Sequence, residues 1–240
     1  MQCVKVRLQL TMKFNQIKAV ILDIDNTLLD FSKCSYLAMQ KSFVEHGLPF
    51  SEKVYTTFTE VNELLWKRIE RGEYTRDLLH KERWNMIFNV LGINYDGEKV
   101  EKSFLDNLYD CVVVIDGAKE IVKYLASKYP VYTASNAPND QQYNRLKVSG
   151  LYPYITKVFT SEALGVDKPQ KLFFDKCFAQ MNGVLPEQTV IIGDSLTADI
   201  KGGKQYGMKT IWYNHLNAPH PQEVFFDIKV NKLIDIKEIL

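Results

Sequence analysis

The stretch from Val20 to Asp30 reads VILDIDNTLLD, a run of apolar residues that leads into two aspartates. The apolar and β-branched residues from Lys18 onward predict a buried strand that extends to Asp25. Because side chains alternate along a strand, we expect Asp23 and Asp25 to point the same way and Ile24 the opposite way. Two carboxylates this close repel each other, and a half-buried pair is costly unless another group compensates their charge. The stretch therefore predicts a charged site at the end of a strand.

The composition is that of an ordinary globular protein. The 240 residues are 46% hydrophobic and 25% charged, with a formal net charge of +1. This length suits one large domain, or a core domain that carries a smaller one. The near-neutral charge gives no support for a nucleic-acid or anionic-membrane partner. No apolar run reaches the roughly 18 residues of a membrane-spanning helix. The N-terminus lacks the apolar region of a signal peptide, so the expected location is the cytoplasm.

The cysteines and histidines form no recognisable metal or redox motif. The four cysteines (Cys3, Cys34, Cys111 and Cys177) include no CxxC pair, and the four histidines include no HExxH arrangement. We interpret the cysteines as small buried side chains or free thiols, and we expect no zinc site.

Helical and strand-like patterns follow one another in a defined order. Residues 4–12 alternate like a strand, which indicates either an extra edge strand or an extension upstream of a start at Met12. Residues 31–110 contain helical periodicity only, in four segments that end near Gly47, Gly72, Gly92 and Asp110. Beyond Gly117, predicted helices (118–128, 139–149, 169–181, 197–206) alternate with predicted strands (130–136, 155–161, 189–194, 209–214). Such alternation predicts an α/β fold with a parallel sheet, into which the helical block is inserted after the first strand.

Polar groups follow three of the predicted strands, where ligands bind in an open α/β sheet. They are Asp23-Ile24-Asp25, Ser135-Asn136 and Gly193-Asp194-Ser195, with Asp199 five residues after Asp194 and Lys168 just before a predicted helix. Each element alone has an ordinary explanation, such as a chance turn, a helix cap or a solvated lysine. Their order along one sheet indicates a shared site.

The chemistry of this set suits phosphoryl transfer. Asp23, Asp25 and Asp194 supply the hard oxygen ligands that Mg²⁺ prefers, and the cation would offset the repulsion between the carboxylates. Lys168 and the hydroxyl of Ser135 supply a positive charge and a donor, which a transferring phosphoryl group requires. One carboxylate could then attack phosphorus, and the second could transfer protons.

The motifs resemble those of a known family. DIDNT at 23–27, SN at 135–136, KP at 168–169 and GDSLTAD at 193–199 resemble, in order, the four motifs of the haloacid-dehalogenase-like hydrolase superfamily, phosphatase branch. The resemblance extends from about Lys18 to the end of the chain. It implies a Rossmann-like core of residues 1–30 and 111–240, with residues 31–110 as an inserted all-helical cap. Ala137 departs from the family pattern, because many members have glycine after the asparagine.

The resemblance also implies three sets of site residues. The catalytic set comprises Asp23 as nucleophile, Asp25 as general acid and base, and Lys168 as the group that stabilises negative charge. The phosphate-binding set comprises Ser135, Asn136 and Thr27, the last of which would also organise the loop. The Mg²⁺-binding set comprises Asp23, Asp25 through its backbone carbonyl, Asp194 and Asp199.

The expected function is a Mg²⁺-dependent phosphomonoester hydrolase that works through an aspartyl-phosphate on a small-molecule phosphate ester. Residues 61–75 and 161–175 resemble the 5′-nucleotidases that act on pyrimidine and noncanonical nucleoside monophosphates. A sugar-phosphate phosphatase or a phosphomutase would keep the same motifs. A 2-haloacid dehalogenase needs no second aspartate such as Asp25, and a catalytically silent binding module would be expected to lack Asp23, Asp25 or Asp194. The expected assembly is a monomer or a weak homodimer.

Overall fold

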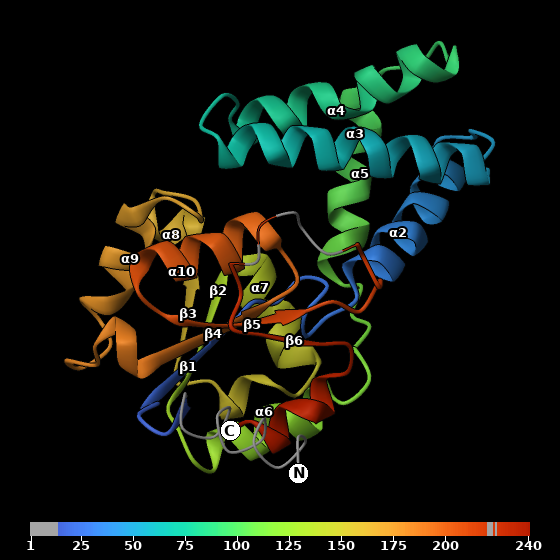
Figure 1. Ribbon diagram of the computed structural model, residues 1–240. Helices are drawn as coiled ribbons and strands as arrows, with labels where there is room; N and C mark the ends of the chain where they lie inside the picture. Colours follow the sequence, from blue (N-terminus) through green and yellow to red (C-terminus); the bar gives the residue numbers. More distant parts are fainter. Residues whose placement is uncertain (1–13, 220–222, 224) are drawn as a thin grey trace. The chain divides into compact units, whose positions relative to one another are not determined.

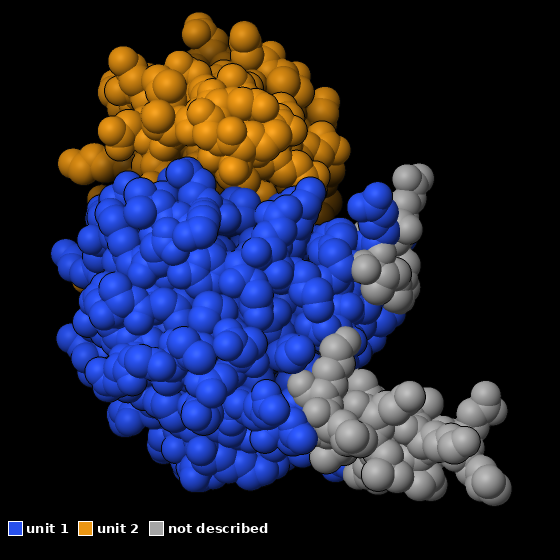
Figure 2. Space-filling model, turned by 60° about the vertical axis from the view of Figure 1, so that its left-hand side comes forward, with its two compact units in different colours: residues 1–30, 114–240 blue, residues 31–113 orange. Residues whose placement is uncertain are grey.

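The computed structural model describes residues 14–219, 223 and 225–240, so the alternation predicted for residues 4–12 lies outside the described residues. The chain divides into two compact units, which Figure 2 shows in different colours. We call residues 1–30 with 114–240 the core unit, and residues 31–113 the helical unit. Within the described part of the chain, no helix is both long and apolar enough to cross a membrane.

The core unit contains a six-stranded, fully parallel sheet with the order β3-β2-β1-β4-β5-β6 (Figure 1). The strands are β1 (Ala19–Leu22), β2 (Val131–Ser135), β3 (Lys157–Thr160), β4 (Thr189–Gly193), β5 (Lys209–Tyr213) and β6 (Ile228–Val230). The predicted α/β class with a Rossmann-like sheet is confirmed. The short strand β6 was not predicted, because three residues are too few to show a period.

The strand order reverses beside β1, and this reversal positions the site. From β1 the chain moves to β2 and β3 on one side, and then crosses to β4, β5 and β6 on the other. Leu22, at the end of β1, lies level with Thr133 of β2 and Ile192 of β4. Residues that follow these three strands are therefore brought to one edge of the sheet, at the switch point where open α/β sheets bind ligands.

Helices cover both faces of this sheet, and all four residues of β1 are fully buried. The helices are α6 (Ala118–Ala126), α7 (Asn139–Val148), α8 (Ser161–Leu164), α9 (Lys171–Phe178) and α10 (Gly202–Tyr206). On one face, Phe173 and Phe174 of α9 belong to the same buried apolar cluster as Ile21 and Ile191 of the sheet. The helix predicted for 197–206 consists of a π-helical segment, Leu196–Lys201, followed by α10.

The first strand ends earlier than predicted. β1 stops at Leu22, and the next residues form a tight turn in which the carbonyl of Ile24 accepts hydrogen bonds from the backbone N–H groups of Leu28 and Leu29. Asn26 has a left-handed φ of 58°, a conformation that asparagine tolerates better than most residues. The predicted strand end at Asp25 is therefore wrong, and the carboxylates of Asp23 and Asp25 have different partners, described below.

The helical unit consists of four helices around an aromatic core. They are α2 (Phe31–Glu45), α3 (Glu52–Glu70), α4 (Arg76–Leu91) and α5 (Gly97–Tyr109). The predicted ends at Gly47, Gly72 and Gly92 are confirmed, and each glycine has a left-handed φ. Trp84 lies within 5.8 Å, between ring centroids, of Phe43, Phe58, Phe88 and Phe104.

A buried ion pair crosses this aromatic core. Arg83 donates to both carboxylate oxygens of Glu101, from Nε at 3.2 Å and from Nη2 at 2.7 Å. Its Nη1 donates to Oδ1 of Asn62 at 2.7 Å, and its guanidinium lies over the rings of Phe58 and Phe104. Because a buried charge is costly unless it is paired and hydrogen-bonded, this network makes α4 and α5 depend on each other.

Candidate active site

The carboxylate of Asp23 lies directly beyond the central strand of the sheet. The backbone N–H of Asp23 donates to the carbonyl of Ile192 at 2.9 Å, which extends the pairing of β1 with β4 by one residue. Its Oδ1 accepts a hydrogen bond from Nζ of Lys168 at 2.8 Å. The nucleophile predicted from the motif is therefore fixed by the backbone on one side and by an ammonium on the other.

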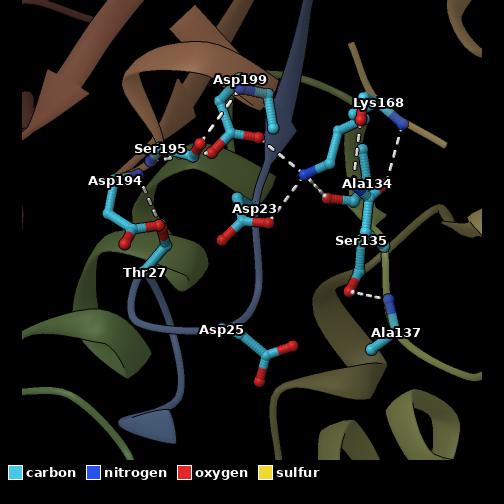
Figure 3. Close-up of polar contacts among 12 residues, drawn as sticks. Asp23, Asp25, Thr27, Ala134, Ser135, Ala137, Lys168, Asp194, Ser195 and Asp199 are labelled. Carbon is cyan, nitrogen blue, oxygen red and sulfur yellow. Dashed lines mark hydrogen bonds and ion pairs between the residues drawn. The ribbon is translucent and has the colours of Figure 1, made fainter. Parts of the chain in front are cut away.

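Lys168 connects three parts of the site (Figure 3). Besides Asp23, its Nζ donates to Oδ1 of Asp199 at 2.6 Å and to the carbonyl of Ala134 at 2.7 Å. The side chain is only 2% exposed, so all three ammonium hydrogens are used inside the protein. Asn136 positions this lysine, because its amide donates to the carbonyl of Lys168 at 3.0 Å and accepts from its N–H at 2.8 Å. Direct contact of Asn136 with a phosphate stays a prediction.

The carboxylates of Asp23, Asp194 and Asp199 form one group, with ligand atoms within 4.8 Å of one another. Both oxygens of Asp199 have protein partners, since Oδ1 accepts from Lys168 and Oδ2 accepts from the backbone N–H of Ser195 at 3.2 Å. Such a group of hard oxygen atoms fits Mg²⁺. The engagement of both Asp199 oxygens favours Asp23 and Asp194 as the direct ligands. Figure 3 shows Asp25 apart from this group, in accord with its assignment through the backbone carbonyl.

Thr27 and Gly193 hold the acidic group in place. The hydroxyl of Thr27 accepts from the N–H of Asp194 at 3.1 Å and lies 3.4 Å from its Oδ1, so it joins the turn after β1 to the end of β4. These contacts favour the predicted loop-organising role, and phosphate binding by Thr27 stays a prediction. A Cβ atom at Gly193 would lie 2.2 Å from Oδ2 of Asp199, so only glycine allows the carboxylate to approach this closely.

The three carboxylates outnumber the Lys168 ammonium, and the pKa values of Asp23, Asp194 and Lys168 are shifted as a result of this and of burial. Burial raises the pKa of Asp23 to about 7, although the nearby Lys168 ammonium acts in the opposite direction. Burial, followed by the neighbouring carboxylates of Asp23 and Asp199, also raises the pKa of Asp194 well above its usual value. Burial alone would lower the pKa of Lys168, but the carboxylates of Asp199 and Asp23 raise it. One ammonium faces three carboxylates, and a divalent cation would correct this imbalance.

Asp25 has a cation of its own. Nη1 of Arg145 donates to its Oδ1 at 2.5 Å, and Nε2 of Gln142 donates to its Oδ2 at 2.5 Å. The sequence reasoning missed both partners. The available signal was the run from Asn139 to Leu146, where polar residues occupy the positions of a buried helix face. Polar residues on a short helix normally indicate a solvated face, so the signal was weak.

Ser135 ends β2 beside these residues. Its buried Oγ accepts from the backbone N–H of Ala137 at 3.1 Å and from Nε2 of Gln142 at 2.8 Å. The hydroxyl therefore keeps its own hydrogen to donate to a ligand. Among the described non-glycine residues, a left-handed φ occurs only at Asn26, Asn182 and Asn217. Ala137 is not one of them, so its departure from the family's glycine strains nothing.

Known proteins share this sequence over nearly its whole length. The family model of haloacid dehalogenase-like hydrolases matches residues 17–207. The chain is 33% identical to the HAD-hydrolase YfnB of Bacillus subtilis, over 93% of this chain and 95% of that protein. It is 35% identical to the pyrimidine 5′-nucleotidase PynA of Streptococcus pneumoniae, over 87% of this chain and 91% of that protein. It is also 26% identical to the glyceraldehyde 3-phosphate phosphatase of Pyrococcus furiosus, over 83% and 82% respectively.

The solved structures agree with these relatives. A crystal structure of YfnB bound to magnesium matches with a TM-score of 0.88 and 32% identity, over 93% of this chain and 98% of that one. A dehalogenase structure matches with a TM-score of 0.75 at 20% identity, which shows the shared fold alone. The resemblance to the superfamily and to its nucleotidases is thus confirmed, and the chain belongs to the haloacid dehalogenase-like hydrolase family.

Proposed function

We propose that this hydrolase cleaves phosphate monoesters through a phosphorylated Asp23, with nucleoside 5′-monophosphates as its substrate class. The observation that carries the proposal is the pairing of the Asp23 carboxylate with the Lys168 ammonium inside a group of three carboxylates at the switch point of the sheet. A carboxylate so placed can attack phosphorus. The substrate class follows from the relatives in Streptococcus pneumoniae and Escherichia coli that are named pyrimidine 5′-nucleotidases.

In the first half of the proposed reaction, a carboxylate oxygen of Asp23 attacks phosphorus while the bond from phosphorus to the leaving oxygen breaks. Asp25 gives its proton to that oxygen. In the second half, Asp25 takes a proton from water as the water oxygen attacks phosphorus. The bond to Asp23 then breaks, and inorganic phosphate leaves. Lys168 and the Ser135 hydroxyl stabilise the negative charge on the phosphoryl oxygens in both halves.

The residues that would hold Mg²⁺ are Asp23, Asp194, the supporting Asp199 and the backbone carbonyl of Asp25. The fit rests on the convergence of hard oxygen donors beside a single ammonium. When bound, Mg²⁺ would offset the charge of the carboxylates and of the phosphoryl group. We also propose the helical unit, residues 31–113, as the cap that selects among phosphate esters.

A sugar-phosphate phosphatase is the second candidate, because several relatives are named glyceraldehyde 3-phosphate phosphatase. A phosphomutase would use the same residues and return the phosphoryl group to a substrate hydroxyl instead of water. The presence of Asp25, held by Arg145 and Gln142, argues against a dehalogenase, which needs no proton-transferring second aspartate. A silent binding module would have no need for the intact group of Asp23, Asp194 and Lys168.

Phosphate release from a panel of esters tests this proposal. The full chain, with Mg²⁺, is assayed on UMP, dUMP and TMP, on purine nucleotides and on sugar phosphates, and kcat/KM is compared. We expect the pyrimidine nucleotides to lead and Asp23→Asn to abolish all activity. Asp106→Asn, an exposed aspartate of α5, serves as the matched control. A preference for sugar phosphates would replace the substrate class, and full activity of Asp23→Asn would disprove the mechanism.

A further inference from the structure

Two side chains of α7 hold the Asp25 carboxylate at both of its oxygens. Arg145 donates from Nη1 to Oδ1 and Gln142 donates from Nε2 to Oδ2, each at 2.5 Å. Both side chains are fully buried, whereas the Asp25 side chain that they bind is 24% exposed. Asp25 is therefore held from the protein side while part of its carboxylate remains open to a reactant.

The placement of these side chains is built into α7. Gln142 and Arg145 are three residues apart, so they lie next to each other on the buried face of the helix. Oε1 of Gln142 lies 3.5 Å from Nη1 of Arg145, and the amide is thereby oriented with its NH₂ group toward Asp25. A buried guanidinium is costly, and its strong, charge-assisted hydrogen bond to a carboxylate offsets part of that cost.

Gln142 also connects Asp25 to the proposed phosphate site. The same Nε2 that donates to Asp25 donates to Oγ of Ser135 at 2.8 Å. One amide thus fixes the distance between the residue that would transfer protons and the residue that would hold the phosphoryl oxygens. Each Asp25 oxygen has two lone pairs, so one hydrogen bond on each oxygen leaves a second lone pair available.

We propose that Gln142 and Arg145 are positioning residues that aim the Asp25 carboxylate for proton transfer, an inference that rests on the proposed function of Asp25. A free aspartate side chain rotates about two bonds, and proton transfer requires it within hydrogen-bond reach of the leaving oxygen. The two α7 residues restrict both rotations.

The test compares two leaving groups in Arg145→Met and Gln142→Met. A nucleoside 5′-monophosphate has a poor alkoxide leaving group that needs a proton, whereas p-nitrophenyl phosphate has a good one that does not. We expect kcat/KM to fall about 10²-fold on the nucleotide, the lower end of the range for general acid catalysis, and only a few-fold on the aryl ester. Lys147→Met removes an exposed cation from the same helix and should leave both values unchanged.

A double variant separates positioning from structural damage. If Arg145 acts through Asp25, then Arg145→Met should cost little more on the nucleotide when Asp25 is already replaced by asparagine. Circular dichroism and the melting temperature show whether each variant folds, and Gln142→Met, which removes no charge, serves if Arg145→Met does not. The proposal is wrong if a variant loses the same factor in kcat/KM on both esters, or if the losses are additive in the Asp25→Asn background. It is also wrong if kcat rises, because the two residues would then hold Asp25 in an inactive conformation. Wild-type activity of Asp25→Asn would instead refute the proposed role of Asp25 itself.

Discussion

Removal of the Asp23 charge should make the protein more stable when no divalent cation is present. The pKa of this carboxyl is about 7 in the folded chain and 3.8 as a free side chain, chiefly because it is buried. Between these two values the folded chain binds more protons than the unfolded chain. The free energy of unfolding therefore falls as the pH rises from about 4 to about 7. The amide introduced by Asp23→Asn carries no charge at any pH, so the unfolding free energy of this variant does not fall in the same way.

The size of the effect follows from the pKa difference. About three units correspond to about 4 kcal/mol, because each unit is 1.36 kcal/mol. The Asp23→Asn protein should exceed the wild type in unfolding free energy by about 4 kcal/mol at pH 8 and by about 2 kcal/mol at pH 5, where the unfolded wild type is ionised and the folded one is not. Loss of the Asp23 charge also lowers the pKa values of Asp194 and Lys168, because the Asp23 carboxylate contributes to raising both.

Urea unfolding in EDTA at pH 5 and pH 8 measures this difference, with Asp106→Asn as an exposed control that should match the wild type at both pH values. Addition of Mg²⁺ should stabilise the wild type more at pH 8 than at pH 5, because the ligands must be deprotonated, and should stabilise Asp23→Asn much less. If Asp23→Asn is no more stable than the wild type at pH 8 in EDTA, or if its advantage is the same at both pH values, the buried charge of Asp23 does not lower the stability of the protein.

Two further substitutions test the packing around the site and in the helical unit. Gly193→Ala should push the Asp199 carboxylate away from Lys168 and lower the unfolding free energy by about 1–3 kcal/mol. Stabilisation by Mg²⁺ in urea unfolding should also become weaker, and a wild-type Mg²⁺ response would contradict this expectation. Arg83→Met should lower the unfolding free energy by about 3–5 kcal/mol, because it leaves the buried carboxylate of Glu101 without its arginine. The double variant Arg83→Met with Glu101→Leu should recover most of this loss. Equal instability of the single and double variants would count against a buried ion pair as the cause.

The parts of the site that the sequence predicts are those determined by short-range rules. A strand that ends in polar residues places them at the sheet edge whatever lies around it, so Asp23, Ser135 and Asp194 could be brought together from their order alone. The early end of β1 at Leu22 was not predictable in this way. It depends on the turn at Asn26, which asparagine permits but does not require.

The missed contacts depend on which face of an element is buried. The sequence predicts Asn136 to be an ordinary loop residue, but its side-chain amide makes two hydrogen bonds with the backbone of Lys168, which is distant in the sequence. Gln142 and Arg145 read as a solvated face because α7 is short and mostly polar. Gln142 and Arg145 face Asp25 only because α7 packs beside β2 and beside the loop that follows β1. No local sequence pattern predicts this packing.

The two aspartates of the first motif are two residues apart, and different elements neutralise them. Asp23 is paired with Lys168, which lies between α8 and α9, and it shares its surroundings with Asp194 and Asp199. Asp25 is paired with Arg145 of α7. A single cation between the two carboxylates would couple their charges, whereas two cations from separate elements allow each carboxylate its own environment. In the proposed mechanism one of these carboxyl groups attacks phosphorus and the other transfers protons, and separate partners let each be positioned for its own step. The arrangement therefore supports a division of roles between Asp23 and Asp25 and gives a physical reason for placing the second cation on α7.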